Sequence, residues 1–165
     1  MENEMIELNE ISQKLVDKLI ENKLTISTAE SCTGGMISSA IVNVPGASSV
    51  LNEAIVTYSN AAKMKYLGVK EDTLNKYGAV SEEVAWQMVE GIAKEANADC
   101  AIAVTGIAGP DGGTKDKPVG TVYAGLYYKG DIKVTRYNFK GDRYLIRLYT
   151  TINVLEDMYK TILDL

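Results

Sequence analysis

Histidine is absent from the 165-residue sequence, and its absence removes the usual general base near neutral pH together with the commonest metal ligand. Serine–histidine–aspartate triads and cysteine–histidine pairs are therefore excluded. The two cysteines, Cys32 and Cys100, lie far apart and neither belongs to a CxxC pair, so a structural zinc site has too few thiolate ligands. A carboxylate-bound magnesium ion has no motif behind it, and we expect neither a metal nor another cofactor.

Long apolar runs are also missing. No segment approaches the roughly 20 apolar residues that span a bilayer, and the polar stretch from Met1 to Glu10 lacks the apolar core of a signal peptide. Two cysteines suit a reducing compartment, so we expect a cytoplasmic protein without a membrane partner. The net charge of −5 repels a phosphate backbone, which argues against nucleic acid. A local cluster of cations can still bind one small anion.

What the sequence does contain predicts a packed core. Apolar residues make up 46% of the chain and charged residues 24%, which are ordinary values for a globular protein. At this length the chain fits one domain, residues 1–165, that buries roughly two-thirds of the surface exposed by its unfolded form. We find no repeat, linker or low-complexity tract.

Hydrophobic spacing predicts helices that alternate with strands early in the chain and a hairpin later. Helices are expected over 6–20, 36–42, 59–67, 81–96 and 144–163, and strands over 24–29, 51–58, 99–105, 121–128 and 133–139. Residues 129–131 supply a glycine turn for the hairpin, and 106–117 form a long glycine-rich loop. These elements predict an α/β fold: a three-layer α/β/α sandwich with a mixed sheet, in which a parallel core is joined by an antiparallel hairpin.

Four segments follow predicted strands or helix ends, where ligands bind in open α/β sheets. In Glu30–Gly35, hydroxyls and amides at a helix N-terminus favour an anion, either a phosphate or a developing oxyanion. An ordinary N-cap with glycines that ease the turn explains the same residues. In Gly46–Ser49, two serines follow a helix break, which is usually turn chemistry.

The third segment, Tyr58–Lys63, contains an informative lysine. If Ser59 or Asn60 caps the helix, Lys63 lies in the first turn, where the helix dipole disfavours a cation. That field and burial together would lower the pKa of Lys63 and let a neutral amine act as a base. A solvated lysine such as Lys65 is the alternative. Because a hydrolase without histidine still needs a base, we favour a serine–lysine pair.

The fourth segment, Thr105–Thr114, follows a strand, and its backbone amides suit a nucleotide. It contains neither GxxxxGK[ST] nor GxGxxG, which excludes an NTPase or a dinucleotide-binding domain of the usual kind. A flexible surface loop is the alternative, although the length of the loop and its close glycine spacing speak against that interpretation.

Six strings occur in order along nearly the whole chain: AESCTGG (29–35), VTYSNAAK (56–63), GAVS (78–81), TGIAGPDGGT (105–114), KPVGTV (117–122) and GDR (141–143). Together they resemble the CinA C-terminal domain family, whose stand-alone members are nicotinamide-nucleotide amidases. The resemblance implies hydrolysis of nicotinamide mononucleotide to nicotinate mononucleotide and ammonia, within pyridine nucleotide salvage. It also implies a metal-free three-layer domain that tends to form a homodimer.

The resemblance assigns the nucleophile to Ser48, the base to Lys63 and a third site residue to Tyr58, with Ala47 where many relatives have a serine. Our hypothesis is that Lys63 deprotonates Ser48, which attacks the carboxamide, while Tyr58 orients the lysine or shuttles a proton. Arg143, with Arg147 one helical turn later, is expected to bind the phosphate. A solvated helix start explains this arginine pair almost equally well.

The turn and the loop are expected to supply oxyanion and nucleotide contacts, through Ser31, Cys32, Thr33, Gly34, Gly35, Thr105, Gly106, Ala108, Gly109 and Gly112. Two rivals stay open. One is a nucleophile at Ser31 or Cys32, because a helix N-terminus lowers the pKa of a thiol. The other is a non-enzymatic nucleotide-binding or dimerisation module, since the family's domain also occurs fused to another enzyme domain.

Overall fold

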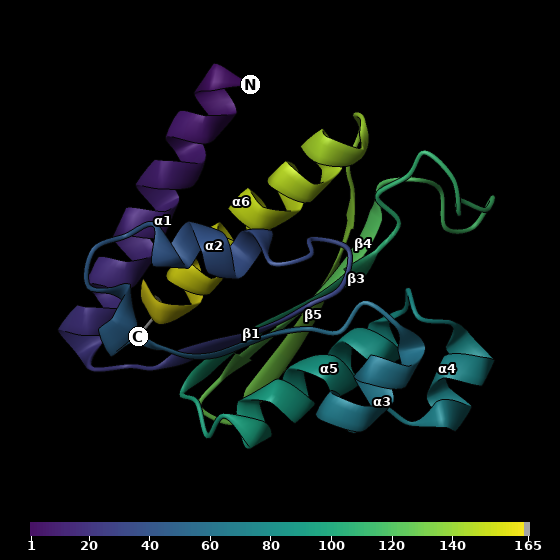
Figure 1. Cartoon of the computed structure of the whole chain (residues 1–165), viewed down its shortest axis with the longest axis horizontal. Helices are drawn as coiled ribbons and strands as arrows, with labels where there is room; N and C mark the ends of the chain where they lie inside the picture. The colour runs from purple at the N-terminus through teal and green to yellow at the C-terminus, as the bar shows by residue number, and fades with distance from the viewer. Residues whose placement is uncertain (164–165) are drawn as a thin grey trace.

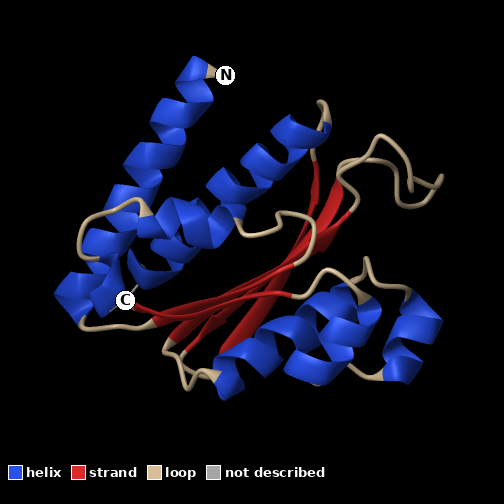
Figure 2. Ribbon diagram, in the orientation of Figure 1, coloured by secondary structure: helices blue, strands red, loops and turns tan. Residues whose placement is uncertain are grey.

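The computed structural model describes residues 1–163 as one mixed sheet between two layers of helices (Figure 1). Five strands lie in the order β2-β1-β3-β4-β5. Their bounds are β1 Ile26–Glu30, β2 Leu51–Val56, β3 Cys100–Gly106, β4 Thr121–Tyr128 and β5 Asp131–Asn138. The layers and the mixed sheet, visible in Figure 2, confirm the predicted α/β/α sandwich.

Helices cover both faces of the sheet (Figure 1). One layer holds α1 Glu2–Asn22, α2 Met36–Val42 and α6 Arg143–Leu163, and the other holds α3 Asn60–Leu67, α4 Glu71–Tyr77 and α5 Glu82–Glu95. A short 3-10 helix, η1 Ala47–Ser49, precedes β2. No helix within residues 1–163 is both long enough and apolar enough to cross a membrane.

Strand direction brings three strand ends to one edge of the sheet. β1 runs parallel to both β2 and β3, whereas β4 pairs antiparallel with β3 and with β5. The carboxyl ends of β1, β2 and β3 therefore meet at one edge, which is where open α/β sheets bind their ligands. The loops that leave this edge carry the segments 31–35, 57–63 and 107–120.

The core explains why β1 and β3 lie in the middle of the sheet. Every residue of β1 is buried, and so is every residue of β3 before its last, Gly106. β2, at the edge of the sheet, is mostly exposed. Both faces of the central strands are thus covered by helices, in agreement with the near-continuous apolar pattern of 99–105.

Two helices differ from the sequence prediction. α1 begins at Glu2 and not at Ile6, and its first turn carries Glu2 and Glu4, acids that interact favourably with a helix N-terminus. α4 was not predicted, because only Leu74 of its seven residues is buried, which leaves no apolar periodicity to detect.

Candidate active site

A cavity of about 220 Å³ opens at the carboxyl edge of the parallel strands. It is lined by side chains or backbone from each of the three strand-following segments, from the segment before α5, and from the start of α6: Ser31, Cys32, Tyr58, Asn60, Lys63, Ala79, Val80, Thr105, Gly106, Ala108 and Arg143. A larger hollow of about 660 Å³ lies between α3 and α5, away from the strand ends. We regard the smaller cavity as the site because it lies at the strand ends and contains a buried lysine in hydrogen-bond contact with a serine hydroxyl.

Lys63 and Ser31 form the central contact of this cavity. The two residues follow neighbouring strands: Ser31 lies directly after β1, and Lys63 lies in the first turn of α3, which follows β2. The distance from Lys63 Nζ to Ser31 Oγ is 3.0 Å, and Nζ also donates to the Thr57 carbonyl at 2.8 Å. A protonated Nζ donates to Ser31 Oγ, and a neutral Nζ can accept the hydroxyl proton across the same contact.

The surroundings of Lys63 favour the neutral amine. Its side chain is only 1% exposed, and no carboxylate within residues 1–163 forms a salt bridge with it. Burial therefore lowers the pKa of Lys63 below its ordinary value of 10.5. Ser59 caps α3 by accepting the Ala62 N–H at 3.1 Å, as predicted, so the helix dipole acts against the charge as well.

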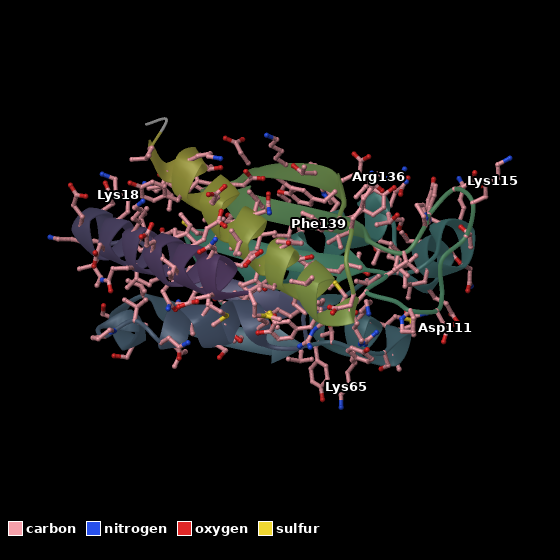
Figure 3. All side chains as sticks on the ribbon, turned by 90° about the horizontal axis from the view of Figure 1, so that it is seen from above. Lys18, Lys65, Asp111, Lys115, Arg136 and Phe139 are labelled. Atoms are coloured by element: carbon pink, nitrogen blue, oxygen red, sulfur yellow. The ribbon has the colours of Figure 1, made fainter. Side chains whose placement is uncertain are left out.

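Lys65 provides an internal comparison on the same helix. It is exposed, and Figure 3 shows it pointing away from the body of the protein. Its ammonium lies 4.9 Å from the centre of the Tyr66 ring, an exposed cation–π contact of the ordinary kind. Lys63 and Lys65 are two positions apart on one helix, yet Lys63 is buried and Lys65 is exposed. Burial is therefore what distinguishes the environments of the two amines.

The turn that carries Ser31 is held by Glu30, a completely buried carboxylate. Glu30 accepts hydrogen bonds from the Thr33 hydroxyl at 2.6 Å and from three backbone N–H groups at the start of α2: those of Gly35 at 3.0 Å, Ile37 at 3.0 Å and Ser38 at 2.8 Å. These donors satisfy a carboxylate that would otherwise be costly to bury. Glu30 belongs to the predicted segment Glu30–Gly35, but this role was not predicted for it.

Cys32 contributes to the wall of the cavity without being a reactive thiolate. Burial raises the pKa of the Cys32 thiol to about 12, whereas the predicted alternative nucleophile needs a lowered value. The rival in which Cys32 attacks the substrate therefore loses its support. Ser31, the other member of that rival, is the residue that contacts Lys63.

Arg143 and Tyr58 form the rim of the cavity. The Arg143 guanidinium donates to the Gly109 carbonyl at 2.6 Å and to the Tyr58 hydroxyl at 2.8 Å. Tyr58 is 61% exposed, and its part near Lys63 Nζ is the backbone carbonyl, at 3.5 Å. The Tyr58 hydroxyl is thus bonded to Arg143, and it is the backbone of Tyr58 that lies near the Lys63 amine. The geometry therefore does not support the expected role of this hydroxyl in orienting Lys63. Arg147, the expected partner of Arg143, donates instead to the Thr33 carbonyl at 2.7 Å.

The predicted contact between Ser48 and Lys63 is wrong within this chain. Ser48 lies in η1, before β2, and lines a separate hollow with Pro45 and Leu51. Lys63 Nζ contacts the Thr57 carbonyl, just beyond the far end of β2. Six strand residues at about 3.3 Å each place the two ends about 20 Å apart. Figure 1 shows the segment between α2 and β2 at one end of the sheet and α3 toward the other.

The remaining predicted binding residues divide into two groups. Ser31, Cys32, Thr105, Gly106, Ala108 and Arg143 line the cavity, whereas Thr33, Gly34, Gly35, Gly109 and Gly112 are not among its lining residues. The loop after β3 projects from one end of the molecule, where Asp111 and Lys115 are labelled in Figure 3. Asn60, Ala79 and Val80 also line the cavity and were not predicted. Asn60 directly follows the Ser59 cap of α3. Because α3 begins just after β2, the position of Asn60 in the sequence could have predicted that it lies at this edge of the sheet.

Within residues 1–163, no three histidine, cysteine, aspartate or glutamate side chains lie together as a metal site requires. The potentially reactive pair that the structure brings together in the cavity is the hydroxyl of Ser31 and the amine of Lys63.

Comparison with known proteins agrees with this architecture. The family model of the CinA C-terminal domain matches residues 8–162. A protein of Clostridium beijerinckii named as competence-damage inducible is 57% identical over 160 residues, which cover 97% of this chain and 38% of that protein. A CinA-like protein of Dictyoglomus turgidum is 49% identical over 155 residues, which cover 94% of this chain and 38% of that protein. The chain thus spans under two-fifths of the length of these relatives.

Solved structures give the same result. The competence/damage inducible protein CihA of Agrobacterium tumefaciens superposes with a TM-score of 0.90 at 39% identity, covering 92% of this chain and 93% of that one. A CinA superfamily protein of Klebsiella pneumoniae superposes with a TM-score of 0.92 at 32% identity, covering 96% and 99%. The family match, the sequence relatives and the shared fold together show that this chain belongs to the CinA C-terminal domain family.

Proposed function

We propose that this protein hydrolyses the carboxamide of nicotinamide mononucleotide to nicotinate mononucleotide and ammonia, with Ser31 as the nucleophile and Lys63 as the base. One observation carries the proposal: a buried lysine that forms no salt bridge within residues 1–163 lies 3.0 Å from a serine hydroxyl in a cavity at the carboxyl edge of the sheet. Serine–lysine pairs perform amide hydrolysis without histidine. The substrate is the one that the family resemblance implies.

The reaction follows from these two side chains. The neutral Lys63 amine takes the proton of the Ser31 hydroxyl as Oγ attacks the carboxamide carbon, and a tetrahedral oxyanion forms. The C–N bond then breaks, Lys63 returns the proton to the leaving nitrogen, and ammonia departs from an ester of Ser31. A water molecule attacks this ester after losing a proton to the same amine, and the acid product leaves as Ser31 recovers its proton.

The size of the cavity suggests how a nucleotide would bind. At about 220 Å³ it is smaller than the roughly 300–1,000 Å³ of pockets that enclose a drug-sized ligand. We therefore propose that the pyridine ring enters the cavity and that the ribose and phosphate stay at its mouth. A guanidinium has five N–H donors, and two of those of Arg143 bind Gly109 and Tyr58. The remaining donors are available to a phosphate, with bidentate geometry.

The test is release of ammonia from nicotinamide mononucleotide, with free nicotinamide and the dinucleotide as comparison substrates. Ser31→Ala and Lys63→Met should both lose activity, and Ser48→Ala, on the far side of β2, is the matched serine control. Hydroxylamine trapping followed by peptide mass spectrometry should place the acyl group on the peptide that contains Ser31. Full activity in both Ser31→Ala and Lys63→Met would refute the mechanism. A wild-type protein that binds the nucleotide without releasing ammonia would support the non-enzymatic alternative.

A further inference from the structure

Attack by Ser31 creates an oxyanion, and this anion needs preorganised donors in a site that excludes water. The start of α2 is the obvious source of N–H groups, but Glu30 already uses them. The Gly35 and Ile37 N–H groups donate to one oxygen of its buried carboxylate and the Ser38 N–H to the other. A second anion there would find no free donor and would be repelled by the carboxylate. The donors must therefore come from elsewhere in the cavity wall.

The backbone N–H of Cys32 is the first candidate. Ser31 to Gly34 form a tight turn, closed by the Gly34 N–H donating to the Ser31 carbonyl at 3.1 Å. Such a turn does not use the N–H of its second residue. Across the part of the chain that the structure describes, no hydrogen bond to another residue has the Cys32 N–H as its donor, and Cys32 lines the cavity beside Ser31.

The backbone N–H of Gly106 is the second candidate, and the strand register shows which way it faces. The Ser31 N–H donates to the Val104 carbonyl at 3.1 Å, and the Ile107 N–H donates to the Thr121 carbonyl at 2.9 Å. Peptide groups alternate along a strand, so Val104 and Gly106 face the β1 side and Ile107 faces β4.

The usual partner of the Gly106 N–H does not pair with it. In a parallel ladder its N–H would donate to the Ser31 carbonyl, but that carbonyl accepts the Gly34 N–H, and no bond from Gly106 to it is found among residues 1–163. Gly106 lines the cavity. Its N–H therefore lies at the point where the β1–β3 ladder ends and the cavity begins.

Cys32 and Gly106 also lie close together. A Cβ atom placed on Gly106 would lie 3.1 Å from Cys32 Sγ, 2.9 Å from the Thr121 carbonyl oxygen and 2.7 Å from a methyl group of Val122. Only glycine fits this close approach. We propose that the backbone N–H groups of Cys32 and Gly106 form the oxyanion hole for Ser31, an assignment that rests on the proposed function.

The first experiment observes the two N–H groups directly with pyridine-3-boronic acid as the probe. Ser31 Oγ bonds to boron, its proton passes to the Lys63 amine, and boron becomes a tetrahedral anion whose oxygen occupies the oxyanion position. Boron-11 NMR reports whether the adduct forms. Because serine precedes cysteine once in the sequence, carbonyl-¹³C serine with ¹⁵N cysteine selects the Cys32 amide alone. Carbonyl-¹³C threonine with ¹⁵N glycine selects Gly34 and Gly106.

The expected result is a downfield shift of the Cys32 and Gly106 amide protons when the adduct forms. The Gly34 amide proton should move less, because it stays bonded to the Ser31 carbonyl. Tetrahedral boron on the wild type with unmoved Cys32 and Gly106 protons would overturn the oxyanion hole and leave the proposed function standing. Tetrahedral boron on Ser31→Ala as well would count against Ser31 and overturn the proposed function itself.

A kinetic comparison gives a second, independent test. Cys32 is the second residue of its turn and has a negative φ, a position that accepts proline. Cys32→Pro removes the N–H, and Cys32→Ala removes the thiol but keeps the N–H, so the two variants form a matched pair. We expect kcat of the proline variant to fall about 100- to 1,000-fold below that of the alanine variant, as for the loss of one oxyanion donor. Equal kcat values in two variants with the same thermal unfolding would overturn the assignment.

Discussion

Replacing Lys63 with methionine removes the buried amine and keeps an unbranched side chain of similar length. Because burial lowers the pKa of Lys63 in the folded protein, the folded protein loses this proton at a lower pH than the unfolded chain. Between the folded pKa and the unfolded value near 10.5, the unfolded state binds more protons. The free energy of unfolding of the wild type therefore rises with pH across this window, relative to Lys63→Met.

The slope of this difference has a defined size. One proton released on folding changes the free energy of unfolding by about 1.4 kcal/mol per pH unit. The wild type should gain stability over Lys63→Met at up to this rate as pH rises, and the gain should stop above the unfolded pKa. Below the folded pKa, Lys63 is protonated in both the folded and the unfolded protein. The difference in the free energy of unfolding between the wild type and Lys63→Met is then constant, and it includes the full cost of the buried charge.

Urea unfolding of both proteins across a pH series measures the effect. Lys65→Met is the matched control, since Lys65 is exposed on the same helix, and its stability curve should run parallel to that of the wild type. The acid limb of kcat/KM reports the pKa of the free enzyme's base, so it should give the same folded pKa as the stability difference. Parallel stability curves for the wild type and Lys63→Met would show that Lys63 stays charged when folded, and would refute the neutral-amine mechanism.

Three further substitutions test separate parts of the structure. Ser48→Ala should leave ammonia release unchanged and stability within about 0.5 kcal/mol, and a large loss of activity would restore Ser48 to the site. Glu30→Gln should lower the free energy of unfolding by about 2 kcal/mol, the size of a hydrogen bond to a charged group, and unaltered urea unfolding would contradict its bonding to α2. Ser81→Ala removes the cap on the Val84 N–H and should cost about 1 kcal/mol by the same assay.

Local sequence signals predicted most of the fold correctly because they coincide with tertiary packing. The apolar run 99–105 became the buried central strand β3, and the predicted cap at Ser59 places Lys63 in the first turn of α3. The low pKa predicted for Lys63 from its position in the first helical turn and from burial agrees with the direction that burial gives in the structure. α4 was not predicted because only one of its seven residues is buried, so the sequence there has no helical spacing of apolar residues.

The predicted contact between Ser48 and Lys63 is wrong for a different reason. Ser48 came from the family resemblance, and no signal in the residues themselves joined it to Lys63. Strand order alone favours Ser31, since Ser31 follows β1 and Lys63 follows β2, and parallel neighbours end at the same edge. Ser48 precedes β2 and so lies at the opposite edge. Sequence spacing could not reveal this, because the fourteen residues between Ser48 and Lys63 include a whole strand, which carries the two positions to opposite ends of the sheet.

Glu30 fixes the turn that carries Ser31 without leaving a bare carboxylate in the core. Its side chain is completely buried, and four hydrogen bonds, from the Thr33 hydroxyl and from N–H groups at the start of α2, offset the cost of burying it. The same bonds occupy the N–H groups at the N-terminus of α2. The turn is thereby fixed by one anion, and the anion formed in catalysis has to be stabilised by donors on the other side of Ser31.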